Sequence, residues 1–407
     1  MMHGMIFQIA FRNFTRNSRR FVLLGLAASA GFFFVCTVQS LVAGLAGQIN
    51  TRGARYYGGH VIISRVENAT PVMTSADEGR FIQEALSRVG IRPAAVSRRT
   101  HLGSRGVVFS NGESVQIRRV IGMDWASEGA EIRGLQFVSG KPDRMSEPGG
   151  ALISEVTARL LGVRVGDQIL LQVNRDAGAL NTIPLWVNAI FREVSIFGYY
   201  TVYMDRGALN QALGRATDSF GSIGLYLDDY RSAGGVAARL HNALDGRFAA
   251  APVVSFMPEI RTMLTALTLT SYGILALLSI VIAVGILNMY RVIIYERTRE
   301  IGTMRAVGIQ RNQVRNIILS EAFFLALCSV ATGLALSAVA LWAVSGIQLS
   351  GAAGFDIFLD RGHLSWVLYP DNVGIDAALI TLITLLGALG PAQSAQRIEP
   401  VAAIRAE

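Results

Sequence analysis

The sequence YERTREIGTMRAVG, residues 295–308, lies between two long hydrophobic runs and decides how the chain is organised. These runs, at about Leu264–Tyr290 and about Ile317–Val344, each exceed the roughly 20 apolar residues that a membrane-spanning helix needs. The charged segment between them is therefore predicted to lie at one membrane surface. There it can pass movement to or from a soluble partner.

Two further hydrophobic runs occur, at Phe21–Ala46 and Val373–Gly390. The first is far longer than the roughly 7–15 apolar residues of a signal peptide, and no clean cleavage site follows it. The second is the shortest of the four and has Asp376 near one end. We expect a membrane α-helical protein with four transmembrane helices and a large α+β extracytoplasmic domain between the first and second helices.

The distribution of arginine predicts the orientation, because short cytoplasmic loops are enriched in basic residues. Arginines gather before residue 21, in the central loop and in the tail, whereas the last loop holds one arginine against three aspartates. Both termini are then cytoplasmic, and the large domain is periplasmic in a bacterial inner membrane. The expected segments are 1–20, helix 21–46, periplasmic domain 47–263, helix 264–290, cytoplasmic coupling segment 291–316, helix 317–344, periplasmic loop 345–372, helix 373–390 and tail 391–407.

Composition excludes several classes of protein. The net charge of +8 comes mostly from the cytoplasmic arginines, and no basic stripe with interleaved aromatics indicates nucleic-acid binding. The two cysteines, Cys36 and Cys328, lie in predicted spans, so no disulfide joins parts of the outer domain. The only lysine, Lys141, precedes a proline, so the Gly-Lys-Ser/Thr motif of a phosphate-binding P-loop is absent.

Strands mixed with few helices, without a repeat, indicate an α+β outer domain. We expect a hairpin around Asn111-Gly112, because this dipeptide favours a two-residue hairpin turn. A helix is expected to run from Pro258 straight into the second span. The domain is predicted to have a membrane-proximal lobe, 47–119 and 216–263, and an inserted β-rich lobe, 120–215.

No residue pattern in this domain indicates catalysis. The five histidines lack metal-ligand spacing, and no serine has a nucleophile-elbow context. We therefore expect no catalytic, metal-binding or cofactor-binding residues, and the chain is predicted not to be an enzyme.

Helical spacing divides the charged segment into two sides. Ile294, Ile301 and Met304 can cluster on one side, whereas Glu296 and Glu300 lie on another. Two glycines, at positions 302 and 308, are predicted to interrupt the helix before the third span. A solvated loop that only sets orientation is the alternative. The mixed charge exceeds what orientation requires and suits docking into a groove on a partner.

The pattern Glu296-Arg297-x-Arg299-Glu300-Ile301-Gly302-x-Met304-Arg305-Ala306-x-Gly308 resembles the signature of FtsX-like permeases, the MacB and lipoprotein-releasing superfamily of ABC transporters. In that family the segment is the coupling helix that engages the ATPase subunit. The resemblance implies that the coupling residues here are Glu296, Arg297, Arg299, Glu300, Ile301, Gly302, Met304 and Arg305. Residues 391–405 resemble the family's ending, although Gln393 and Gln396 stand where basic residues are common.

Motifs outside the coupling segment extend the resemblance. Gly122-Met123-Asp124 and residues 161–167 look like the family's extracytoplasmic core domain. Gly59-His60, residues 197–204 and Leu368-Tyr369-Pro370 most resemble LolC/LolE-type lipoprotein-releasing permeases.

This resemblance implies a permease that extracts lipoproteins from the outer leaflet of the inner membrane for outer-membrane sorting. Its expected partners are an ABC ATPase dimer, which binds ATP and magnesium, a second permease chain, the lipid bilayer and a periplasmic lipoprotein carrier. A MacB-like or FtsX-like exporter or mechanotransmitter for another amphiphile or peptide is an alternative. A non-transport protein of cell division or signalling is a third.

Two further predictions concern the spans. A lipid anchor needs an apolar cavity open sideways, and its candidate walls, which ordinary helix packing also explains, are Val38, Leu41, Leu45, Met263, Leu264 and Leu267. Glu321 is an acid inside the third span, where a carboxylate is costly unless it is paired or reaches the interface. We hypothesise a pair with Arg297 or Arg305, with snorkelling to the interface as the alternative.

Overall fold

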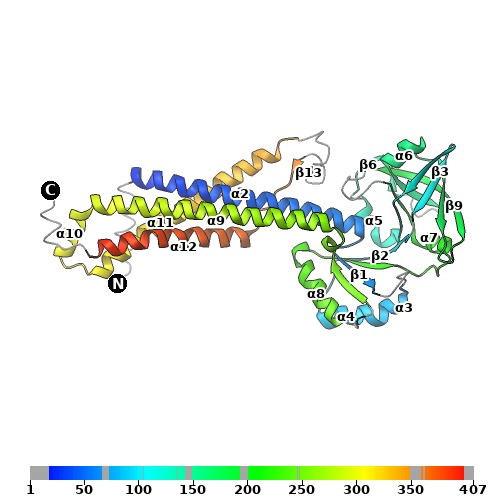
Figure 1. Cartoon of the computed structure of the whole chain (residues 1–407), viewed down its shortest axis with the longest axis horizontal. Helices are drawn as coiled ribbons and strands as arrows, with labels where there is room; N and C mark the ends of the chain where they lie inside the picture. The colour runs from blue at the N-terminus through cyan, green and yellow to red at the C-terminus, as the bar shows by residue number, and fades with distance from the viewer. Residues whose placement is uncertain are drawn as a thin grey trace. The chain divides into compact units, whose positions relative to one another are not determined.

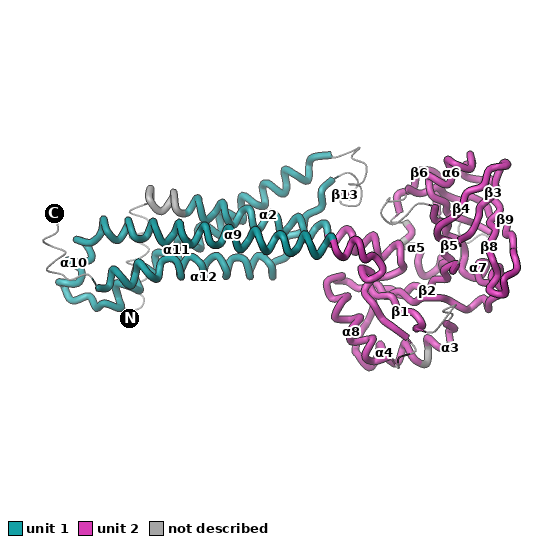
Figure 2. The backbone as a smooth tube through the Cα atoms, viewed as in Figure 1, with its two compact units in different colours: residues 1–45, 263–349, 361–407 teal, residues 46–262, 350–360 magenta. Residues whose placement is uncertain are grey.

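The computed structural model describes residues 18–66, 73–103, 105–133, 135–142, 149–192, 200–244, 246, 248–348, 359–360 and 363–397. The chain forms two compact units (Figure 2). Unit 1 comprises residues 1–45, 263–349 and 361–407, and unit 2 comprises residues 46–262 and 350–360. The predicted leader before residue 18, part of the motif at 197–204 and the tail beyond residue 397 lie outside the described residues.

Four long helices, each apolar enough to cross a membrane, supply the helical part of the fold (Figure 1). They are α2 (Ser18–Tyr57), α9 (Pro258–Glu296), α11 (Arg311–Ser345) and α12 (Pro370–Ala395). The predicted start of a helix at Pro258 is confirmed. All four extend beyond the apolar runs predicted from the sequence.

Small and hydroxylated side chains hold the helices of unit 1 together. Ser29 and Thr332 lie 2.6 Å apart, and Thr37 and Ser337 lie 2.7 Å apart, each pair joining α2 to α11. A Cβ placed on Gly333 would lie 2.7 Å from the Ser29 carbonyl oxygen, so this glycine allows the backbones to approach closely. In lipid, where apolar surface gives no preference between helix faces, such contacts determine which faces meet.

Unit 2 is built on a mixed sheet whose twelve strands, among the described residues, have the order β12-β1-β11-β2-β5-β10-β7-β9-β8-β3-β4, with β6 paired to β9. The β5–β10 and β7–β9 pairs are parallel. The strands are β1 (Val61–Arg65), β2 (Ala95–His101), β3 (Gly106–Ser110), β4 (Glu113–Ile117), β5 (Arg119–Met123), β6 (Phe137–Gly140), β7 (Gly150–Ser154), β8 (Gln168–Asn174), β9 (Leu180–Phe191), β10 (Thr201–Asp205), β11 (Ser222–Tyr226) and β12 (Phe248–Pro252).

Short helices accompany the sheet. They are α3 (Ser75–Asp77), α4 (Gln83–Val89), α5 (Trp125–Arg133), α6 (Glu155–Leu161), α7 (Arg206–Leu213) and α8 (Ala233–Ala243), with a π-helical turn at Glu78–Ile82 and 3₁₀ turns at Tyr230–Ser232 and Val253–Phe256. Two short strands, β13 (Leu359–Asp360) and β14 (His363–Leu364), follow α11. The expected fold class, four spanning helices with an α+β domain after the first, is confirmed.

Local sequence explains several of these elements. The predicted hairpin is β3–β4, and its turn residues Asn111 and Gly112 have φ of 51° and 83°, as a primed two-residue turn requires. Helix α6 begins where the Ser154 hydroxyl accepts a hydrogen bond from the Thr157 amide, and it ends at Gly162 with φ of 63°. Side-chain caps and left-handed glycines of this kind satisfy the free ends of short helices.

The structure corrects the predicted division of unit 2 into lobes. The hairpin β3–β4 was assigned to the membrane-proximal lobe 47–119, but β3 pairs with β8. Val108 and Ile117 are buried in one cluster with Leu171, from the inserted segment. The apolar face of a hairpin packs where a matching face is available, and here that face comes from a distant part of the chain.

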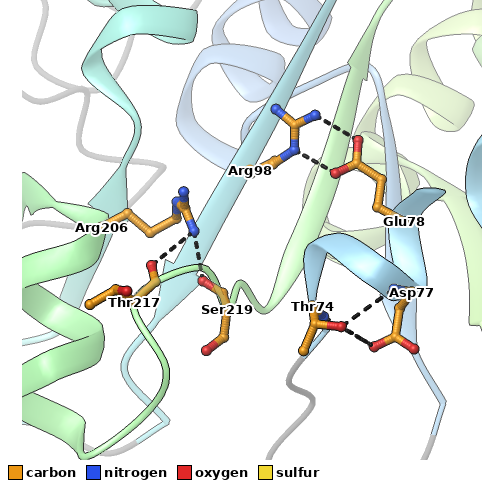
Figure 3. A network of polar contacts seen from close by, with 7 residues as sticks. All are labelled: Thr74, Asp77, Glu78, Arg98, Arg206, Thr217 and Ser219. Atoms are coloured by element: carbon orange, nitrogen blue, oxygen red, sulfur yellow. Dashed lines mark hydrogen bonds and ion pairs between the residues drawn. The ribbon is translucent and has the colours of Figure 1, made fainter.

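Polar contacts join the short elements around β2 (Figure 3). Arg98 donates to both carboxylate oxygens of Glu78, at 2.6 and 2.7 Å. Arg206, at the start of α7, donates to the carbonyl oxygens of Thr217 and Ser219, at 3.4 and 2.9 Å. These arginines fix the π-helical turn and the segment before β11.

Candidate functional site

The charged segment forms its own helix, α10 (Thr298–Ala306), directly after α9. The break falls at Arg297, whose φ of −97° and ψ of 9° leave the helical region. Gly302 does not interrupt the helix, contrary to prediction, but lies buried within it. A glycine inside a helix costs about 1 kcal/mol, and burial of the neighbouring Ile301 offsets this cost. Gly308, with φ of 104°, follows the end of α10 as predicted.

The eight predicted coupling residues fall into two sets. Three are exposed and could meet a partner: Glu296, Arg299 and Glu300. Five are buried or half-buried against the other helices: Arg297, Ile301, Gly302, Met304 and Arg305. The sequence pattern did not make this distinction.

The inward set attaches α10 to two membrane helices. Arg297 donates to both carboxylate oxygens of Glu321 on α11, each at 3.4 Å, so the hypothesised pair is confirmed. The Glu321 side chain is 3% exposed and that of Arg297 is 15% exposed. Arg305, the other candidate partner, donates at 3.3 Å to the carbonyl oxygen of Gln396, the C-cap of α12. A cation is favourable there, because the helix dipole places partial negative charge at that end.

A small cavity of about 30 Å³ lies between α10, the C-terminal end of α9 and the N-terminal end of α11. Tyr290, Arg297, Glu300 and Glu321 supply its polar lining, with apolar side chains including Ile301. This volume could hold about two water molecules. The Tyr290 hydroxyl is buried and has no hydrogen-bond partner within the described part of the chain. The base of α10 therefore combines an ion pair with room for rearrangement.

Two exposed hydrophobic residues flank α10 and were missed by sequence reasoning. Tyr295 is 85% exposed and Val307 is 88% exposed. Tyr295 is out of phase with Ile301 and Met304 on a helix, and this position was the signal that could have identified it. Val307, three residues after Met304, had no such signal. Together with the exposed charged set they form what we call the α10 surface: Tyr295, Glu296, Arg299, Glu300 and Val307.

The predicted walls of a substrate cavity are not distinguished by the structure. Val38, Leu41 and Leu45 on α2 are half-buried, and so are Met263, Leu264 and Leu267 on α9. Half-burial suits both a cavity wall and ordinary helix packing, so this assignment stays a prediction.

A second buried acid lies in the helices of unit 1. Asp376 on α12 is 4% exposed and accepts a hydrogen bond of 3.2 Å from Gln39 on α2. Sequence reasoning treated Asp376 only as a weakness of the fourth span. Its amide partner, 337 residues away in sequence, could not be identified from the pattern.

The histidines of unit 2 have structural surroundings. The His60 ring accepts a hydrogen bond of 3.0 Å from the Leu227 amide, and burial lowers the pKa of His60 although Asp229 opposes the shift. Burial, followed by the charges of Arg119 and Arg99, lowers the pKa of His101 to about 3. Among the described residues, no group of three or more His, Cys, Asp or Glu side chains could hold a metal ion.

Comparisons with known proteins bear on this site. Residues 272–400, which include α10, match the FtsX-like permease C-terminal family. The uncharacterised ABC transporter permease YknZ of Bacillus subtilis is 27% identical over 239 residues, 56% of each chain. The macrolide export ATP-binding/permease protein MacB of Chromobacterium violaceum is 32% identical over 136 residues, 33% of this chain and 19% of MacB. The probable syringafactin export ATP-binding/permease protein SyfD of Pseudomonas syringae is 31% identical over 153 residues, 37% of this chain and 20% of SyfD.

Two solved structures were also matched. The extracellular domain of YknZ aligns over 47% of this chain and 98% of its own length, with 13% identity and a TM-score of 0.33. The periplasmic region of MacB from Actinobacillus actinomycetemcomitans aligns over 51% and 95%, with 14% identity and a TM-score of 0.32. The chain spans about half the length of YknZ and about a fifth of the MacB and SyfD proteins. It contains an FtsX-like permease domain and is homologous to the ABC transporter permeases YknZ and MacB.

Proposed function

We propose that this chain is the permease subunit of an ABC transporter and that α10 receives the movement of a separate ATPase dimer. The observation that carries the proposal is that α10 is attached on one face and exposed on the other. Arg297 and Arg305 attach it to α11 and α12, whereas Tyr295 and Val307 are almost fully exposed at its ends. A push on the α10 surface would therefore move the attached helices.

The chemistry of the α10 surface suits a protein groove. Exposed aromatic and aliphatic side chains supply the apolar contacts that anchor an interface. The charges of Glu296, Arg299 and Glu300 add specificity and orientation. ATP and magnesium would bind to the ATPase. In this arrangement α10 and both termini are cytoplasmic and unit 2 is periplasmic, as the arginine distribution predicts.

Two kinds of cargo remain candidates. The LolC/LolE-like motifs favour lipoproteins, extracted from the outer leaflet with a second permease chain and a periplasmic carrier. The names of MacB and SyfD, which refer to macrolide and syringafactin export, favour a MacB-like exporter of another amphiphile. In either case a lateral apolar cavity near Val38 and Leu264 would admit the apolar part of the cargo.

The coupling proposal is tested by replacing Glu296 and Glu300 with lysine in the tagged full-length chain. We expect the co-purifying ATPase to be lost, because two attractive charges on the α10 surface become repulsive. Glu113→Lys with Asp218→Lys, a matched reversal of two exposed acids in unit 2, should leave the ATPase bound. Equal recovery of the ATPase with the wild type and the α10 variant would reject the proposal.

The cargo is tested by depleting the chain and fractionating the inner and outer membranes. If lipoproteins are the cargo, they accumulate in the inner membrane because nothing extracts them. An unchanged distribution would exclude lipoprotein release and leave the MacB-like alternative, which is then tested by comparing amphiphiles in the medium with and without the chain.

A further inference from the structure

Side chains of the sheet bind the end of α2 within unit 2. Arg99 on β2 donates from Nη1 to the Tyr56 carbonyl oxygen at 2.8 Å. The Tyr226 hydroxyl on β11 donates to the Ala54 carbonyl oxygen at 3.3 Å. The last carbonyl groups of a helix have no partner within the helix, and a positive charge is favourable beside them. Arg99 therefore supplies both the donor and the charge that the end of α2 needs.

The Arg99 guanidinium is held from a second side by Glu128 on α5. Arg99 Nη2 lies 2.6 Å from Glu128 Oε2, and both side chains are 1% exposed. Burial alone would lower the pKa of Arg99, but the charge and hydrogen bond of Glu128 together with Tyr226 and Tyr203 raise it, so the guanidinium stays charged. One buried arginine thus joins three elements, α2, β2 and α5.

A second arginine acts on the same helix end. The Arg119 guanidinium on β5 lies 3.9 Å from the ring centroid of Tyr56 and 4.6 Å from that of Tyr57. Cations at such distances over aromatic faces are attracted to them. The Tyr57 hydroxyl also donates to the Phe256 carbonyl oxygen at 3.3 Å, just before α9 begins.

We propose that Arg99 is a positioning residue that fixes the end of α2 to β2 and α5, so that displacement of α2 during transport reaches the sheet of unit 2. This inference rests on the proposed function. Well-packed apolar residues can replace a buried ion pair with little loss of stability. They cannot replace the hydrogen bond to the Tyr56 carbonyl. Stability and positioning can therefore be separated by substitution.

The test is the double variant Arg99→Met with Glu128→Leu in the full-length transporter with its ATPase. We expect thermal unfolding close to that of the wild type, but a several-fold loss of cargo moved per ATP hydrolysed. In hydrogen exchange, amides of residues 54–58 should exchange faster while those of β7 and β9 are unchanged. Normal exchange at 54–58 with normal transport would overturn the inference.

The control uses the neighbouring pair on the same strand. Arg98→Met with Glu78→Leu removes an arginine–glutamate pair that has no hydrogen bond to α2 among the described residues, so exchange at 54–58 and transport should be retained. If this control lowers transport as much as the Arg99 variant, the effect is general and the inference fails.

A variant that does not fold requires a milder change. Arg99→Lys keeps the charge but cannot reach both Tyr56 and Glu128, so it should fold and still show faster exchange at 54–58; unchanged exchange would again overturn the inference. Failure of the proposed function gives a different result, because the wild-type chain would then show no ATP-driven cargo movement at all.

Discussion

Two arginine–glutamate pairs, Arg99–Glu128 in unit 2 and Arg297–Glu321 in unit 1, differ in how tightly they are enclosed. In unit 2 the Arg99–Glu128 distance is 2.6 Å with both side chains 1% exposed, and a main-chain carbonyl occupies another donor. In unit 1 the Arg297–Glu321 distance is 3.4 Å, the arginine is 15% exposed, and a cavity lies beside it. The Arg99–Glu128 pair is therefore fixed in one arrangement. The Arg297–Glu321 pair has space beside it in which the side chains can rearrange.

The surroundings support this difference. Glu300 lies 3.8 Å from the Arg297 guanidinium and offers it a second acid. Arg99 is enclosed by α2, β2 and α5. In a transporter, Arg99–Glu128 would hold α2, β2 and α5 in one fixed arrangement. Arg297–Glu321 would hold α10 to α11 but allow the contact to rearrange. Substitutions can test whether burial and alternative partners set the strength of each pair.

The largest effect is expected for Arg99→Met alone. Glu128 would remain buried without its cation, and breaking a buried pair from one side costs about 3–5 kcal/mol. We expect the free energy of unfolding of the full-length chain to fall by that amount, measured by denaturant titration with tryptophan fluorescence. Arg98→Met is the control, and its effect should be smaller because Arg98 is 30% exposed. Equal losses would mean that burial does not distinguish the pairs.

A smaller effect is expected for Glu321→Gln. Arg297 keeps a hydrogen-bond acceptor and can turn toward Glu300, so we expect a loss of about 1–2 kcal/mol, between the values for surface and buried pairs. The attachment of α10 should loosen, and a thiol at the buried position 301 should then react faster in an Ile301→Cys variant lacking Cys36 and Cys328. A labelling rate that Glu321→Gln leaves unchanged would show that the pair does not hold α10.

Much of unit 1 could be predicted because membrane helices follow simple rules. Apolar length gave the spans, and the cost of a carboxylate in lipid required a partner for Glu321. The arginines of the charged segment before the third span could reach it, so a pair with Arg297 or Arg305 was predicted, and the structure forms the pair with Arg297. Which residues of α10 face outward was not, because the break at Arg297 sets the rotation of the helix and has no glycine or proline to mark it.

Unit 2 was less predictable because its contacts are distant in sequence. Strand β2 reads AVSRRTH, which lacks an apolar alternation and was not expected to be a strand. The burial of Arg99 depends on a carboxylate 29 residues later and a carbonyl group 43 residues earlier. The hairpin β3–β4 was predicted from its turn, but its pairing with β8 depends on a match between two apolar faces that no local pattern reveals.

The burial of His101 on β2, beside Arg99 and Arg119, also predicts a dependence of stability on pH. Burial, then Arg119 and Arg99, lowers the pKa of His101 to about 3 in the folded chain. The unfolded chain binds this proton near pH 6.5. Between these values the unfolded state holds more protons, so stability falls as the pH is lowered, by roughly 1 kcal/mol per pH unit below 6.5. Denaturant titrations at pH 7 and pH 5.5 measure the loss.

The control for this prediction is His101→Gln, which keeps a polar side chain near Ser222 but cannot titrate. Between pH 7 and pH 5.5, the free energy of unfolding should fall less in this variant than in the wild type, because the contribution of His101 is removed. A variant with the full wild-type dependence would assign the effect to other groups, such as His60, whose pKa is also lowered by burial.

The smallest effect is expected for the pair Glu84–Arg88 on α4, which separates distance from burial. Its 2.7 Å separation nearly equals that of Arg99–Glu128, but the two side chains are 61% and 62% exposed. Water screens such a pair, so Glu84→Gln should cost only about 0.3–0.5 kcal/mol. The loss should shrink further in 1 M salt, where the screening length is about 3 Å. If this exposed pair costs as much as Glu321→Gln, short distance rather than burial would control the strength of these pairs. The difference in burial between Arg99–Glu128 and Arg297–Glu321 would then not explain why one pair is fixed and the other can rearrange.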